Sequence, residues 1–148
     1  MDAADVQSAL TATAAESKRL DALSLPGPTG ESNRLSTFSR PPLLCMGPGK
    51  DVAEAQAKAV EALGGRALRA TGSIPADALE TLTGFSGALW WGDEATARAM
   101  GLALSRRNGP ILPLITGMPD RGHACHERHV CVDTTAAGGN AALLGGAG

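Results

Sequence analysis

The chain has 148 residues and a formal net charge of -2, and hydrophobic residues make up 43% of it. This hydrophobic content excludes a wholly disordered chain, and the weakly acidic charge excludes the basic field that attracts nucleic acid. The length is typical of one domain. Aromatic residues make up only 3% and glycines number 19, which predicts a lean core of small side chains. We therefore expect part of a larger protein rather than a complete enzyme.

Cysteine usage and the N-terminal residues predict where the protein resides. Three cysteines cannot all pair within one chain, and an odd number is typical of a reducing compartment. No run of 18 apolar residues occurs, and the chain begins with the acidic MDAADVQSAL, so we expect neither a membrane span nor a secretory signal. These features predict a cytoplasmic protein.

Residues 1–42 are expected to hold one helix and a connector. Apolar residues at helical spacing, from Val6 to Leu20, predict a helix over residues 2–20. Residues 24–42 read SLPGPTGESNRLSTFSRPP, and their prolines and glycines predict a long connector without regular structure. Connectors of this length are usually linkers or functional loops.

Residues 43–126 alternate short apolar runs with amphipathic segments. Asp51 and Asp93 are expected to cap helices, and Gly64-Gly65 is expected to end the first of them. Strand–helix alternation at this spacing is typical of βαβ units, so the predicted fold class is α/β, with a small Rossmann-like parallel sheet and flanking helices. The predicted strands are 43–46, 66–69, 87–91 and 111–115, and the predicted helices are 51–63, 74–82 and 93–107.

Residues 127–148 are expected to form an extended C-terminal strand and a tail. His129 and Cys131 alternate with valines, which predicts a strand over residues 129–133. The tail that follows, TTAAGGNAALLGGAG, could lie in a groove of another domain, whereas a glycine-rich end by itself is usually frayed. The sequence thus divides into residues 1–42, 43–126 and 127–148.

One alternative is an independent nucleotide-binding protein. Gly47-Pro48-Gly49 stands between a predicted strand and a predicted helix, where a dinucleotide-binding fingerprint would lie. However, Pro48 lacks an N–H donor, Asp51 adds negative charge to the helix start, and Val52 replaces the third glycine of that fingerprint. The pattern therefore favours a tight turn without a ligand.

A second alternative is a metal-binding module. Five histidine and cysteine residues lie close together in the sequence, and these are zinc-ligand types. Two of them are adjacent, and no second pair at ligand spacing occurs elsewhere, so a chance cluster is favoured. The five are His123, Cys125, His126, His129 and Cys131.

Two segments are not explained by a generic α/β scheme. One is LPGPTGESNR at Leu25–Arg34, and the other is ERHVCVDTTAAGGNAALL at Glu127–Leu144. In this order, and separated by a small α/β unit, they resemble the C-terminal region of the proline utilization A family. The motifs of that family read like LPGPTGE-x-N and ER-x-x-x-V-[ND]-T-[TA]-AAGGNA. Its members are bifunctional bacterial enzymes that oxidise proline to glutamate.

The resemblance implies a non-catalytic module that packs on an aldehyde dehydrogenase domain, in cis or across a dimer, and helps to enclose the channel for the intermediate. The parent protein would carry an FAD-dependent proline dehydrogenase and an NAD-dependent glutamate semialdehyde dehydrogenase. We therefore expect no catalytic residue, cofactor or metal in this chain. The residues expected to make interdomain contacts are Pro28, Thr29, Gly30, Glu31, Asn33, Arg34, Thr134, Thr135, Gly138, Gly139 and Asn140.

Overall fold

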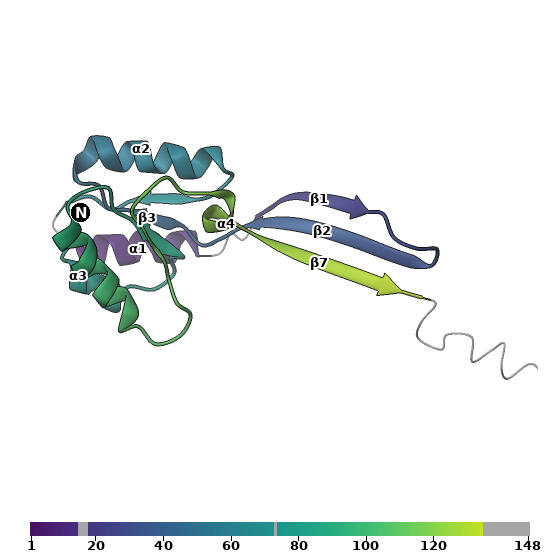
Figure 1. Cartoon of the computed structure of the whole chain (residues 1–148). Helices are drawn as coiled ribbons and strands as arrows, with labels where there is room; N and C mark the ends of the chain where they lie inside the picture. Colours follow the sequence, from purple (N-terminus) through teal and green to yellow (C-terminus); the bar gives the residue numbers. More distant parts are fainter. Residues whose placement is uncertain (15–17, 73, 135–148) are drawn as a thin grey trace, which may run out of the picture. The chain divides into compact units, whose positions relative to one another are not determined.

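A computed structural model of the chain describes residues 1–14, 18–72 and 74–134 (Figure 1). Its internal contacts divide the chain into two compact units. The first comprises Met1–Lys18 and Ser39–His126, and we call it the α/β unit. The second comprises Arg19–Phe38 and Glu127–Gly148, and we call it the sheet unit.

The α/β unit contains a four-stranded parallel sheet, which confirms the predicted fold class. Its strands lie in the order β4-β3-β5-β6, so the chain moves from the central strand β3 to one side and then to the other. This is the strand arrangement of a small Rossmann-like sheet. The strands are β3 (Leu43–Cys45), β4 (Ala67–Arg69), β5 (Gly87–Leu89) and β6 (Leu114–Ile115).

Helices cover both faces of this sheet because each strand is apolar on both sides. Leu44 and Ala88 contribute to a core with α1 (Ala3–Thr13), the short 3-10 helix η1 (Ala76–Glu80) and α3 (Glu94–Ser105). Leu43 and Leu89 pack on the opposite side with Val60 of α2 (Gly49–Ala62). Figure 1 shows α2 on one side of the sheet and α1 and α3 on the other.

Two helix starts and one helix end test the sequence predictions. Asp93 caps α3, accepting a hydrogen bond from the Thr96 amide at 2.8 Å, as expected. Asp51 does not cap α2, which starts after Pro48; Asp51 lies in the first turn, where the helix dipole also favours a carboxylate. The predicted helix over residues 2–20 is too long, since α1 ends at Thr13 and β1 starts at Arg19. The buried residues of α1 are Val6 and Leu10.

The prediction of an irregular connector over residues 24–42 is wrong. An antiparallel hairpin occupies most of it, formed by β1 (Arg19–Leu25) and β2 (Glu31–Ser39). The Pro and Gly residues are concentrated in the hairpin turn, where they are compatible with strand pairing on either side. Gly30 adopts a φ of +88° there, and a Cβ at Gly27 would lie 2.6 Å from the Asn33 side-chain nitrogen.

The third strand of the sheet unit comes from the other end of the sequence. After the short helix α4 (Arg121–Ala124), β7 (Cys125–Asp133) pairs with β2 in the order β1-β2-β7. Its strand starts four positions before the predicted boundary at His129. The contacts Gly30–Thr134 and Asn33–His129 progress in opposite directions along the two strands, so β7 runs antiparallel to β2.

We predict that Leu44→Ala destabilises the α/β unit by about 3 kcal/mol, because the fully buried side chain would leave a cavity between sheet and helices. Urea unfolding followed by tryptophan fluorescence measures this unit alone, since Trp90 and Trp91 both belong to it. Leu102→Ala, at a side chain 52% exposed on α3, is the control and should cost less than about 1 kcal/mol. Equal effects of the two substitutions would contradict this packing.

Candidate functional site

The sheet unit brings the two unusual sequence segments together. Thr134 donates from its backbone N at 3.0 Å and from its hydroxyl at 2.7 Å to the carbonyl oxygen of Gly30, which lies 104 positions earlier. The turn that precedes β2 is thereby joined to the end of β7. Both segments are recognisable in the sequence, but their pairing is not, because they are about a hundred positions apart.

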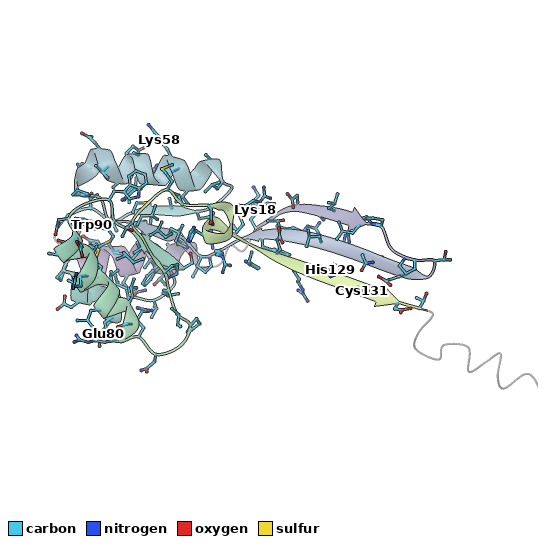
Figure 2. The ribbon with its side chains drawn as sticks, viewed as in Figure 1. Lys18, Lys58, Glu80, Trp90, His129 and Cys131 are labelled. Atoms are coloured by element: carbon cyan, nitrogen blue, oxygen red, sulfur yellow. The ribbon has the colours of Figure 1, made fainter. Side chains whose placement is uncertain are left out.

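A chain of polar side chains crosses from β7 to β2. His129 Nε2 lies 3.1 Å from Asn33 Oδ1, and the Asn33 side-chain amide donates to Glu31. The Glu31 carboxylate also interacts with the Cys131 thiol and raises its pKa. Figure 2 labels His129 and Cys131 along β7. The four side chains satisfy one another, which makes them a structural link between the strands.

The Cys131 thiol is poorly suited to act as a nucleophile. Desolvation, followed by the hydrogen bond to Glu31 and the charges of Glu31 and Asp133, raises the pKa of this thiol. A raised pKa reduces the thiolate fraction at neutral pH, and the thiolate is the reactive form. Cys45 is fully buried in β3, and burial raises the pKa of its thiol to about 12.

The predicted contact residues are distributed over both parts of this site. Pro28 and Thr29 lie exposed in the hairpin turn, Glu31 and Asn33 are half-buried in β2, and Arg34 is exposed beside them. Gly30 and Thr134 form the contact between the turn and β7. Four further predictions lie outside the described residues: Thr135, Gly138, Gly139 and Asn140.

The sheet unit has no hydrophobic core of its own among the residues that the structure describes. None of its side chains belongs to the clusters of buried apolar residues. Leu23 is 58%, Val130 44% and Val132 50% exposed, and β1 is exposed along nearly its whole length. A small sheet normally needs one face covered to be stable. These exposed apolar side chains are candidates for contact with a partner, and the alternation of Val130 and Val132 with polar residues was the sequence signal for the strand that carries two of them.

In the α/β unit, the Gly47-Pro48-Gly49 turn is occupied by the protein itself. The buried Gln56 side chain accepts from Gly47 N at 3.0 Å and donates to Gly47 O at 2.9 Å. The same Gly47 oxygen accepts from the backbone N of Trp91. Since Pro48 has no N–H, this turn does not present the free donors that a pyrophosphate needs.

The histidines and cysteines singled out as metal-ligand types have separate local partners. Cys125 is buried and its thiol donates to the carbonyl of Leu63, whereas His123 pairs with Asp120 at 2.9 Å. His129 and Cys131 belong to the polar chain of the sheet unit. Among residues 1–14, 18–72 and 74–134, no group of three or more His, Cys, Asp or Glu side chains is placed to hold a metal ion.

The described residues thus define a small Rossmann-like α/β module that carries an antiparallel three-stranded sheet. None of the helices in that part of the chain is long and apolar enough to cross a membrane. No family model and no curated protein matches the sequence.

Solved structures similar to this chain include those of proline utilization A, the family that the two segments resemble in sequence. One is a bifunctional proline utilization A protein at 24% identity, and another is a variant of the Bradyrhizobium japonicum protein at 23%. A third, at 24% identity, has proline bound in remote sites. Each has a TM-score of 0.49, with 64% of this chain and 13% of the other chain covered. This chain therefore spans a small part of the length of those proteins.

We predict that Glu31→Gln makes Cys131 react faster with a thiol reagent at pH 8. The carboxylate raises the pKa of this thiol, so its removal lowers that pKa and increases the thiolate fraction. Absorbance during reaction with a disulfide reagent measures the rate, and Cys131 is the one exposed thiol of the three. Glu127→Gln removes an exposed carboxylate from the same strand and should leave the rate unchanged. An unaltered rate in Glu31→Gln would contradict the contact.

Proposed function

We propose that this chain is a non-catalytic C-terminal module of a proline utilization A-like enzyme. In this proposal the module packs on the aldehyde dehydrogenase domain of its parent protein, in cis or across a dimer. It would help to enclose the path of the aldehyde intermediate between two active sites. FAD and NAD would be bound by the parent protein and not by this module.

The observation that carries the proposal is the sheet unit without a core. Hydrophobic burial contributes roughly 25 cal/mol per Å² of apolar surface, and the exposed side chains of β1 and β7 gain none of it among the described residues. A partner surface would supply this burial. The α/β unit, in contrast, has a core of its own.

A second line of support comes from where the motifs lie. The described residues of the segments that resemble the family's motifs lie in the turn, β2 and β7 of this one sheet. Among their polar groups, Glu31, Asn33 and His129 link the two strands, and the Cys131 thiol has a raised pKa. This arrangement favours a role in shape and contact over bond-making. Enclosure would act by excluding water and retaining the reactive aldehyde.

The direct test is binding of the purified full chain to the aldehyde dehydrogenase domain of a proline utilization A homologue from the same source. We expect a stoichiometric complex in analytical ultracentrifugation. Leu23→Asp and Val132→Asp each place a charge on an exposed apolar position, and the two positions lie on opposite faces of the sheet unit. At least one of them should weaken the complex ten-fold or more, about 1.4 kcal/mol.

The matched control is Leu102→Asp, which places the same charge at a similarly exposed leucine of α3 in the α/β unit. It should leave binding unchanged. Absence of any complex, or equal weakening by all three substitutions, would overturn the proposal. In the complete enzyme, the damaging substitution should also lengthen the lag before NADH appears when proline is the substrate.

A further inference from the structure

The three-stranded sheet separates its charges by face. Directly paired residues of neighbouring strands share a face, and the face alternates along each strand. The register pairs Asp21 with Thr37 and Leu23 with Leu35, while the contacts of His129 with Asn33 and Cys131 with Glu31 bring β7 into the same alternation. One face, which we call the acidic face, carries Asp21, Glu31, Glu127 and Asp133.

The opposite face, which we call the arginine face, carries every arginine of the sheet unit. Arg19 pairs with Phe38 and Arg34 pairs with Ser24, which places both on the side away from Glu31. On β7 the alternation puts Arg128 there too, flanking Val130 and followed by Val132. Each of the two valines is close to half exposed.

The two faces also differ in how their polar groups are satisfied. On the acidic face, Glu31 interacts with Asn33 and Cys131, and Asp21 and Asp133 have partners as well. On the arginine face, Arg19, Arg34 and Arg128 make no side-chain hydrogen bond or ion pair with any residue that the structure describes. Three guanidinium groups of like charge therefore share a face, and none of the residues 1–14, 18–72 and 74–134 compensates them.

We propose that the arginine face is the one that docks, and that it takes a protein surface with carboxylates around an apolar strip. This inference rests on the proposed docking function and names the face and the chemistry of the partner. Arginine is enriched in protein interfaces because its planar guanidinium binds carboxylates in a bidentate way. Val130 and Val132 would lie against the apolar strip, and the arginines would fix the register.

The composition of this face favours a protein partner over a nucleic acid or a membrane. Its central positions on β7 are valines, which gain from an apolar complement and have no partner on a phosphate backbone. The whole chain also has a net charge of -2.

The test compares two double variants that change the net charge equally and a third that leaves it unchanged. Arg34→Glu with Arg128→Glu reverses two charges on the arginine face. Lys58→Glu with Arg98→Glu reverses two exposed cations on α2 and α3 of the α/β unit. Arg34→Lys with Arg128→Lys retains the charge. The Cys131 thiol reaction rate, measured on the acidic face, reports whether the sheet remains folded in each variant.

Two probes are used, the dehydrogenase domain and poly-L-glutamate as a simple acidic polypeptide. With the domain, we expect at least a ten-fold loss of affinity for the Arg34/Arg128 charge reversal, a smaller loss for the lysine variant and no change for the α2/α3 control. A decrease in the affinity of the wild-type chain for the domain as salt increases would support ion pairs made by the arginines. Equal binding by the charge-reversed and wild-type chains would overturn the choice of face and leave the proposed function standing.

If wild type does not bind the domain, the proposed function fails, and poly-L-glutamate decides the inference about the face. Binding of poly-L-glutamate that the Arg34/Arg128 reversal abolishes and the control retains would support it. No binding, or binding that both double variants retain, would overturn it. Binding to phosphatidylserine vesicles but to neither protein probe would also overturn it, in favour of a membrane surface.

Discussion

The pairing of β2 with β7 is the contact on which the sheet unit depends. It joins segments about a hundred positions apart through the Gly30 carbonyl, Thr134 and the side-chain contact between Asn33 and His129. Without β7, the first two strands would be an isolated hairpin, which is at best marginally stable in water. The third strand also completes the alternation that separates the acidic side chains from the arginines.

The two units reach stability in different ways. The α/β unit buries apolar side chains on both faces of its sheet, and Gln56 and Asp93 satisfy backbone groups at its turns and helix ends. The sheet unit relies on backbone pairing and polar side chains, and it leaves leucine and valine exposed. The proposal that the sheet unit docks on a partner rests on this difference between the two units.

The parallel sheet was predictable because its information is local. Each strand from Leu43 onward is a short apolar run, and each helix between them has a start or stop signal such as Asp93 or Gly64-Gly65. The observed boundaries differ from the predicted ones by a few residues. For example, α2 begins at Gly49, after Pro48, and not at Asp51. Local propensity and tertiary packing agree throughout this part of the chain.

The sequence by itself determined the α/β class and the identity of two unusual segments, because periodicity and motif spacing are properties of neighbouring residues. Only the tertiary structure decided that residues 24–42 contain a hairpin and that β7 completes its sheet. Prolines and glycines between Leu25 and Glu31 suggest a loop locally, whereas their flanks pair with each other and β2 gains a second partner, β7, from a distant segment. The tertiary structure also decided which charged side chains share a face of the sheet. This depends on the register between β2 and the distant strand β7.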